Sequence, residues 1–437
     1  MPKSITQNSF ILLGFRVISL LISLCSGIII ARALGPEGKG VLSIAFLVPT
    51  LLCTFFVLDS GVGIRYYIAK KPDQVGDMVK SSFVCGGLLG ITLVVLSYLT
   101  LIPFHKLIAQ RIPVDILNIS ILLVPFMVTG YLFSAVLSGL KRFFTVSVIG
   151  LADIATYTVL ILVLSQISLT IKGVVISKLA TSLVMALIFV TVMWKGKLIT
   201  RLATVDGGLL KDIVKYGLKS YPGTIAQFLS YRLDFFLVAY FLSFEQVGLY
   251  ALAVSWSELL FYLPDSMAMA LFPTIASSKS IKDSNELTAI MTKAVMIIMF
   301  IGSIFIFLFA GKLIPLLYTD KFLNSIYPLF ILLPGVIMLS VWKIVLSDLA
   351  GRGFPQYKSI SSTIGMVSNV VLNIVLIPLY GINGASLATT VSYSLTAILA
   401  IYWFTKTTGT TLRQLLFVQL EDLTLILSKV ARRRHAA

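Results

Sequence analysis

The sequence predicts an all-α polytopic membrane protein, with about 12 transmembrane helices in two six-helix lobes around a central cavity and a C-terminal interfacial helix. Hydrophobic residues make up 58% of the 437 residues and charged residues only 12%, whereas charged residues average about 25% in soluble proteins. Apolar runs of about 20 residues, the length that crosses a bilayer as a helix, recur along the chain. These observations exclude a soluble globular fold.

Twelve apolar segments are expected to span the membrane. The first carries one preceding cation and continues beyond the length of a signal-peptide core, so we interpret it as a span and not as a cleavable signal. The expected spans are residues 10–34, 41–68, 81–103, 117–138, 143–166, 171–194, 214–242, 246–273, 289–311, 326–349, 357–380 and 382–404.

The longest loop between spans, Lys195 to Lys215, indicates how the chain is divided. We expect an N-terminal six-helix lobe over residues 1–195, a cytoplasmic linker over 196–213 and a C-terminal six-helix lobe over 214–405. Residues 406–437 are expected to form a cytoplasmic amphipathic helix and a basic tail.

Pairs of similar segments, one in each lobe, indicate that the lobes are related by duplication. Residues 31–42 align with residues 239–250 and share alanine, leucine, glutamate and glycine positions, and residues 139–143 resemble residues 351–354. Several similar pairs in the same order are stronger evidence of duplication than one pair, because chance matches are common in apolar sequence. Transporters are frequently built from such repeats.

The distribution of lysine and arginine predicts the orientation in the membrane. If the N-terminus is inside, 22 loop and tail cations lie on the inner face and 6 on the outer face. This is a strong positive-inside signal, and it predicts that both termini are cytoplasmic. Because these cations are spread along one membrane face and do not cluster on a soluble domain, the net charge of +17 does not indicate a nucleic-acid partner.

The C-terminal segment 411–430 has apolar residues at helical spacing, interrupted by Glu421, Asp422 and Lys429. This pattern favours an interfacial helix on the cytoplasmic leaflet. A thirteenth span is the alternative, and it would have to bury two acids in lipid.

Seven cations lie inside the expected spans, where a charge facing lipid is costly. Arg32, Arg65 and Lys219 lie near span ends, and the simple interpretation is that their heads reach the interface. For Arg16, Arg232 and Lys343 we expect a cavity-facing role, and the guanidinium group suits phosphate because it binds two oxygens at once. The candidate substrate-binding cations are Arg16, Arg65, Lys219, Arg232 and Lys343, and the remaining two are Arg32 and Lys178.

Six acids also lie inside the expected spans, and two interpretations remain open for them. Each carboxylate either neutralises a nearby cation or helps to bind a coupling ion, H⁺ through a raised pKa or Na⁺ through several oxygens. The candidate coupling or cavity acids are Asp59, Asp153, Asp234, Glu258 and Asp265, and the sixth is Asp348. With two histidines and three cysteines without metal spacing, we expect no catalytic residue, no metal centre and no cofactor beyond a coupling ion.

Proline and glycine within the expected spans indicate places where helices bend. Pro222, Gly223 and Pro264 are candidate hinges, because proline frees a backbone carbonyl and kinks a helix. A fixed kink that serves packing is the alternative.

Several motifs resemble those of the polysaccharide biosynthesis and O-antigen flippase family of the multidrug/oligosaccharidyl-lipid/polysaccharide exporter superfamily. The segment 31–40, ARALGPEGKG, resembles the AR-x-LGP-x-x-x-G signature of that family. Further matches follow in order along nearly the whole chain. They are Tyr231-Arg232-Leu233-Asp234, Val247-Gly248-Leu249-Tyr250, Leu271-Phe272-Pro273 and the segment 372–385.

The resemblance implies two six-helix lobes around a central cavity and transport by alternating access. It implies an undecaprenyl-diphosphate-linked oligosaccharide as substrate, with H⁺ or Na⁺ as the coupling ion, in the bacterial cytoplasmic membrane. Polysaccharide polymerase and chain-length proteins are the implied partners. On this chain it makes Arg16, Lys219, Arg232 and Asp234 cavity residues.

Two other functions remain open. A cation-coupled multidrug exporter of the same superfamily would favour an acidic cavity, and the embedded charges here are mixed. A membrane glycan polymerase or ligase would need a large outer loop, and no expected outer loop much exceeds a dozen residues. We therefore expect a transporter and not an enzyme.

Overall fold

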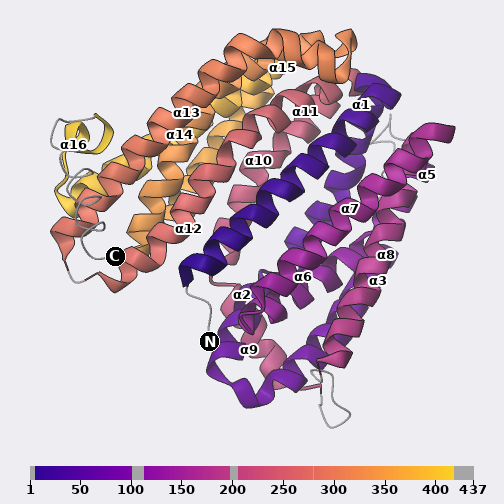
Figure 1. The fold of residues 1–437 in the computed structure, drawn as a ribbon, viewed down its shortest axis with the longest axis horizontal. Helices are drawn as coiled ribbons and strands as arrows, with labels where there is room; N and C mark the ends of the chain where they lie inside the picture. Colours follow the sequence, from indigo (N-terminus) through magenta and orange to yellow (C-terminus); the bar gives the residue numbers. More distant parts are fainter. Residues whose placement is uncertain (1–4, 101–112, 197–204, 279, 418–437) are drawn as a thin grey trace. The chain divides into compact units, whose positions relative to one another are not determined.

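The structure, a computed structural model, describes residues 5–100, 113–196, 205–278 and 280–417, and within these ranges every regular element is a helix (Figure 1). The chain forms two compact units. Unit 1 comprises Met1–Ala251 with Pro315–Phe322, and unit 2 comprises Leu252–Ile314 with Leu323–Ala437. The expected lobes at residues 1–195 and 214–405 were defined by membrane spans, whereas the two units are defined by how the helices pack. The division into lobes therefore stays a prediction.

In the described ranges, nine helices are long and apolar enough to cross a membrane. The two longest, α1 (Ile5–Phe56) and α15 (Gln356–Thr408), are each interrupted at one glycine, Gly35 with φ 68° and Gly381 with φ 60°. Only glycine adopts this backbone region freely. Both interruptions lie where the sequence predicts a turn between consecutive spans. The multi-pass helical fold is thus confirmed, and the count of twelve stays a prediction.

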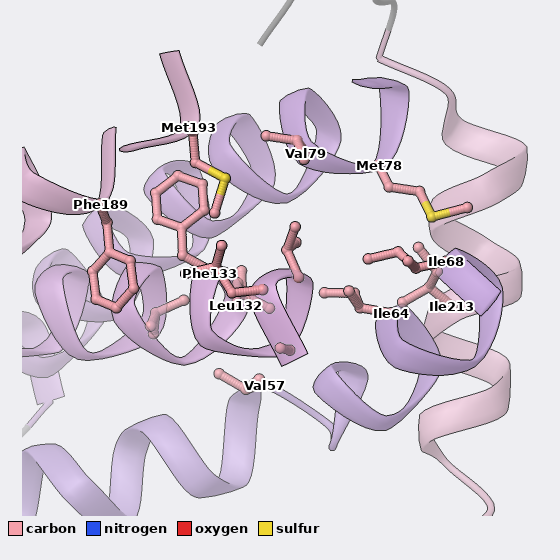
Figure 2. Packing of buried hydrophobic residues seen from close by; sticks show 14 of the residues in the cluster. Val57, Ile64, Ile68, Met78, Val79, Leu132, Phe133, Phe189, Met193 and Ile213 are labelled. Carbon is pink, nitrogen blue, oxygen red and sulfur yellow. The ribbon is translucent and has the colours of Figure 1, made fainter. Parts of the chain in front are cut away.

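The core of unit 1 is formed by helices that pack through apolar side chains. Helix α6 packs against α2 and α3, α9 packs against α2, and α1 packs against α7. Figure 2 shows Phe133 of α6 beside Phe189 and Met193 of α8, and Ile213 of α9 beside Ile64 of α2. The helices after α1 are α2 (Ser60–Lys70), η1 (Pro72–Gln74), α3 (Val75–Thr100), α5 (Val114–Ile121), α6 (Val124–Gly139), α7 (Phe143–Ile167), α8 (Ile171–Lys195), α9 (Gly207–Gly217), α10 (Tyr221–Phe241) and α11 (Phe244–Glu258).

The second expected span, 41–68, is not one continuous helix. The chain leaves helical geometry at Val57–Asp59, between α1 and α2, where Leu58 has φ 53° and Asp59 has φ 52°. Side chains other than glycine disfavour this left-handed region, although aspartate tolerates it better than most. The sequence gives no proline or glycine signal at these positions, so the break was not predicted.

Unit 2 is organised around α14, which packs against α12 and α15. Asp348 of α14 is fully buried, and it accepts hydrogen bonds from Arg352 Nε at 2.5 Å and from Thr288 Oγ1 at 2.6 Å. The elements after α11 are η2 (Leu259–Phe261), α12 (Tyr262–Ser277), α13 (Ile281–Tyr318), η3 (Asp320–Ser325), α14 (Ile326–Gly351), α15 and α16 (Leu412–Leu416). Of the expected interfacial helix, α16 covers the start, and residues 418–437 lie outside the described residues.

The first pair of aligned segments meets in the structure. A Cβ atom at Gly40 of α1 would lie 1.8 Å from the carbonyl oxygen of Phe244, and a Cβ atom at Gly248 of α11 would lie 1.8 Å from the carbonyl oxygen of Pro36. Gly40 and Gly248 occupy corresponding positions of the aligned segments, and so do Pro36 and Phe244. The contact is therefore reciprocal, as expected where two copies of one motif cross about a local two-fold axis. Small residues permit such close backbone approach between membrane helices.

The second pair of similar segments, residues 139–143 and 351–354, has the same local structure in both copies. The amide of Arg142 donates to the Leu137 carbonyl at 2.8 Å, and the amide of Phe354 donates to the Leu349 carbonyl at 2.9 Å. The residue before each, Lys141 with φ 59° and Gly353 with φ 93°, is left-handed. Helices α6 and α14 thus end in the same C-terminal turn, which supports an origin by duplication.

We predict that Gly40→Ala and Gly248→Ala each destabilise the protein by about 1–3 kcal/mol, since each added methyl group overlaps a backbone carbonyl that cannot move aside. Thermal unfolding of the detergent-solubilised variants tests this. Gly311→Ala is the control, because nothing lies within 4 Å of a Cβ atom at Gly311. Melting temperatures equal to that of the control would disprove the tight crossing.

Candidate functional site

Unit 1 contains a cavity of about 690 Å³ among α1, α6, α7 and α8. Its wall is mostly apolar, with a band of hydroxyl groups and one ion pair. Ligand sites usually have this character, with a few polar groups in an apolar pocket. The polar side chains are those of Ser23, Ser26, Thr50, Tyr131, Ser134, Asp153, Tyr157, Lys178 and Ser182.

The ion pair of this cavity joins α7 and α8. Lys178 Nζ lies 2.8 Å from Asp153 Oδ2 and 5.4 Å from the ring centroid of Tyr157. About 30% of each charged side chain is exposed (31% and 28%), so both reach the cavity. Asp153 was a candidate coupling or cavity acid, and here it neutralises a cation. Lys178 was not among the candidate site residues, although an acid and a cation on consecutive spans joined by a short turn are a signal for such a pair.

Asp59 lies at the break between α1 and α2 and binds hydroxyl groups. Its Oδ2 accepts hydrogen bonds from Ser220 Oγ at 2.5 Å and from Thr224 Oγ1 at 3.0 Å, and its Oδ1 accepts one from Tyr131 OH at 3.2 Å. Ser220 and Thr224 belong to the start of α10, and Tyr131 also lines the cavity. Through Tyr131, the cavity is connected to the Asp59 carboxylate.

Three of the candidate cations have exposed side chains in unit 1. Arg16 lies on α1, Arg65 lies on α2, and Lys219 lies in the segment between α9 and α10 with its Nζ 5.5 Å from the Tyr216 ring. Arg32 has a structural role, since its guanidinium group donates to the carbonyls of Leu316 and Leu317 at the end of α13. A cation is favourable at a helix C-terminus.

Arg232 and Asp234 of α10 have different surroundings. Asp234 is 2% exposed and accepts a hydrogen bond of 2.5 Å from the hydroxyl group of Tyr250, which holds α10 against α11. The half-buried Arg232 has its guanidinium carbon 5.9 Å from the Phe235 ring. Asp234 is therefore buried between α10 and α11, whereas the Arg232 side chain is partly exposed, and a cavity role of either residue stays a prediction.

In unit 2, the candidates Lys343 and Asp265 form an ion pair. Lys343 Nζ lies 2.6 Å from Asp265 Oδ1 and 4.1 Å from the ring centroid of Phe261. The Lys343 side chain is 10% exposed and that of Asp265 47% exposed. Glu258, the remaining candidate acid, is half-buried at the end of α11.

The candidate hinge residues lie directly after interruptions of the helices. Pro222 and Gly223 lie in the first turn of α10, after the turn Leu218–Ser220 that separates α9 from α10. Pro264 lies within one continuous helical stretch, Phe244–Ser277, in which the 3₁₀ segment η2 (Leu259–Phe261) joins α11 to α12. The helix therefore changes its geometry in the turn before Pro264, where a proline frees a backbone carbonyl, and hinge motion stays a prediction.

Comparison with known proteins establishes the family. Residues 29–327 match the family described as "Polysaccharide biosynthesis protein", which is more than half of the chain. The chain belongs to this polysaccharide biosynthesis family. The resemblance inferred from the ARALGPEGKG segment is therefore confirmed.

Two known proteins are similar to this chain in sequence. Both are from Haloferax volcanii. The "probable low-salt glycan biosynthesis flippase Agl15" is 22% identical over 86% of this chain and 78% of the relative. The "probable flippase AglR" is 25% identical over 39% of this chain, and that match covers only 37% of the relative.

Two solved structures share the fold. The lipid II flippase MurJ in an inward closed conformation has a TM-score of 0.75 at 14% identity and covers 96% of this chain and 92% of its own. An inward-facing multidrug resistance MATE transporter of the MOP superfamily has a TM-score of 0.75 at 16% identity, with coverages of 90% and 94%. At these identities the comparison shows the fold alone, and the fold is that of the expected superfamily.

We predict that Asp265→Asn destabilises the protein by about 1–3 kcal/mol, because it leaves the nearly buried Lys343 without its anion; the partial exposure of Asp265 keeps the cost below that of a fully buried pair. The double variant Asp265→Asn/Lys343→Met removes both charges and should recover most of this loss. Thermal unfolding of the wild type, both single variants and the double variant measures the coupling. Additive effects of the two substitutions would contradict the ion pair.

Proposed function

We propose that this protein is a flippase that moves a lipid-linked oligosaccharide across the cytoplasmic membrane by alternating access. The carrier expected from the family resemblance is undecaprenyl diphosphate, and the oligosaccharide is a repeat unit of O-antigen, capsule or exopolysaccharide. The observation that carries the proposal is the match to a probable glycan biosynthesis flippase over 86% of this chain. The family match over residues 29–327 supports it independently.

The substrate sets a physical requirement that the described residues can meet. A diphosphate head group needs cations and hydrogen-bond donors away from lipid, while the polyprenyl chain stays in the bilayer. Arg232 is half-buried, and its planar guanidinium group can bind two phosphate oxygens at any working pH. Arg16, Arg65 and Lys219 add further positive charge with exposed side chains.

An H⁺ or Na⁺ gradient as the driving force is part of the proposal. Asp153 and Asp265 are each bound to a lysine, and this pairing accounts for both carboxylates without a coupling ion. Asp59 binds only hydroxyl groups in the described residues. It is therefore the strongest candidate for ion coupling.

The second candidate function is export of drugs or other small molecules. It is favoured by one observation, the fold shared with a multidrug resistance MATE transporter at the same TM-score as with MurJ. The two proposals differ in the substrate that accumulates when the protein is absent. A polymerase or ligase is the weakest alternative, since no relative reported above supports it.

Complementation tests the proposed function. The gene is expressed in a strain that lacks its own glycan flippase, and the lipid-linked glycans that accumulate are identified by mass spectrometry. Restored glycan export and loss of the accumulated intermediate are expected. An unchanged intermediate, together with increased resistance to toxic small molecules, would instead establish the exporter.

We predict that Arg232→Ala lowers glycan export at least tenfold while the protein still inserts in the membrane, because neutral alanine cannot pair with the diphosphate. Export in the complemented strain and the amount of protein in isolated membranes are the two measurements. Arg142→Ala is the matched control, since Arg142 is an exposed arginine in the turn before α7. Equal export by the two variants would refute a role of Arg232 in binding.

A further inference from the structure

Helices α2 and α9 of unit 1 pack against each other, and neither is long enough to cross a membrane (Figure 1). Each has 11 residues, whereas a transmembrane helix needs about 20. A Cβ atom at Gly63 would lie 2.2 Å from the carbonyl oxygen of Ile213, and a Cβ atom at Gly217 would lie 2.7 Å from that of Asp59. The two helices are therefore antiparallel and in backbone contact.

Helix α9 has one apolar face and one basic face. Leu209, Ile213 and Gly217 recur every four residues and are buried, and the first two belong to the core of unit 1. Lys211 and Lys215 are exposed and lie on the opposite face, since successive residues of a helix are rotated by about 100°. Short helices of this character lie in the plane of a membrane interface, with the basic face toward the head groups.

Both helices lie at one end of a membrane helix. Helix α3 follows α2 and η1 directly, and the amide of Asp206, the N-cap of α9, donates to Ser81 Oγ near the start of α3 at 3.2 Å. The apolar stretch Val75–Leu99 of α3 has 25 residues, so it is about 38 Å long and exceeds the bilayer core of about 30 Å. Its first turns therefore reach the head groups, and α2 and α9 lie there as well.

Tyrosine rings lie among the lysine side chains of these two helices. Tyr66 of α2 stacks on Tyr216 of α9, with ring centroids 4.1 Å apart and planes 13° apart. Lys70 Nζ lies 5.6 Å from the ring centroid of Tyr66, and Lys71 Nζ lies 5.9 Å from that of Tyr67. Tyrosine is enriched where a membrane protein meets the head groups. We define the α2–α9 patch as the surface formed by Tyr66, Tyr67, Lys70, Lys71, Lys211, Lys215 and Tyr216.

The positive charge of the α2–α9 patch is not balanced within the described part of the chain. Helix α2 contains no acid, and α9 contains only Asp212. No carboxylate of the described residues lies within 4 Å of a lysine of the patch. Lys178 and Lys343, in contrast, each bind an aspartate. The patch therefore has the charge to bind an anionic partner outside the chain.

We propose that the α2–α9 patch binds anionic phospholipid head groups of the leaflet that it faces, which the distribution of cations predicts to be the cytoplasmic one. Clusters of four or more lysines beside a membrane helix attract acidic lipids, and the tyrosine rings lie at the depth of the head groups. Arg65 and Lys219 flank the patch and stay candidates for the substrate. The proposal needs only the membrane fold and is independent of the transport function.

Native mass spectrometry of the purified full-length protein tests the proposal, with phosphatidylglycerol and phosphatidylcholine added separately as probes. The wild type should bind phosphatidylglycerol at least tenfold more tightly, because the patch attracts its charge. Lys70→Gln/Lys71→Gln/Lys211→Gln/Lys215→Gln, the patch variant, should lose this preference. Its substitutions keep the side-chain length at exposed or half-buried positions, so the fold should be retained, and circular dichroism checks this.

The matched control removes the same number of positive charges from exposed cations at other helix ends. It is Lys195→Gln/Lys282→Gln/Lys406→Gln/Arg413→Gln. The control variant should keep the preference of the wild type for phosphatidylglycerol. Equal losses in the patch and control variants would overturn the proposal, because net charge alone would then determine lipid binding. Equal affinities of the wild type for the two lipids would also overturn it.

Hydrogen–deuterium exchange locates the lipid on the chain. The protein is placed in nanodiscs of phosphatidylcholine with or without phosphatidylglycerol, and the amides followed are those of Leu210 and Leu218, which hydrogen-bond within α9. Phosphatidylglycerol should slow their exchange about threefold in the wild type and not in the patch variant, since head groups then cover the basic face of α9. Unchanged exchange in the wild type would contradict binding at this patch.

Pyrophosphate distinguishes a phospholipid site from a site for the diphosphate of the proposed substrate. In the same nanodiscs, sodium sulfate and sodium pyrophosphate at equal ionic strength should reduce the protection of α9 about equally, because both act by screening. Selective loss of protection with pyrophosphate would overturn the proposal and assign the patch to the substrate. Complementation, which tests the flippase proposal, does not depend on either outcome.

Discussion

A charge inside a membrane protein must find its partner within the protein, because lipid offers neither water nor a counter-ion. This constraint organises both units. Lys178 binds Asp153, Lys343 binds Asp265, and Arg352 binds the fully buried Asp348. Each pair joins different helices or closes a helix end, so the charges also fix the packing of apolar helices that have few other specific contacts. Asp59 departs from this pattern, since hydroxyl groups of Tyr131, Ser220 and Thr224 take the place of a cation.

The duplication of the chain gives the second organising feature. Gly40 and Gly248 bring the two copies of one motif into reciprocal backbone contact, and the turns after α6 and α14 repeat the same hydrogen bonds. A crossing of this kind restricts how α1 and α11 can move, because backbone lies against backbone and leaves no room for a side chain at Gly40 or Gly248. The contact explains why the ARALGPEGKG segment has glycine at residue 40. Arg32 of the same segment donates to a carbonyl at the end of α13.

Much of the fold was predictable, since long apolar runs can only form membrane helices and the turns at Gly35 and Gly381 carry a clear signal. The sequence also identified which charges lie inside the spans. It could not show which acid pairs with which cation, because Lys343 and Asp265 are far apart along the chain and meet only through the packing of α12 and α14. The break at Leu58 and Asp59 was missed because neither residue is typical of a helix end; tertiary contacts with Gly217 and Ser220 stabilise it.

Movement of a lipid-linked oligosaccharide between the leaflets of a membrane can be measured on the purified protein with a leaflet-resolved assay. Proteoliposomes are loaded with a lipid-linked oligosaccharide, and a glycosidase that cannot cross the bilayer is added outside. If the protein is a flippase, vesicles that contain it lose glycan from both leaflets, while protein-free vesicles lose only the outer-leaflet fraction. Protection of the inner-leaflet glycan in both preparations, with an H⁺ or Na⁺ gradient of either direction imposed, would contradict a flippase function.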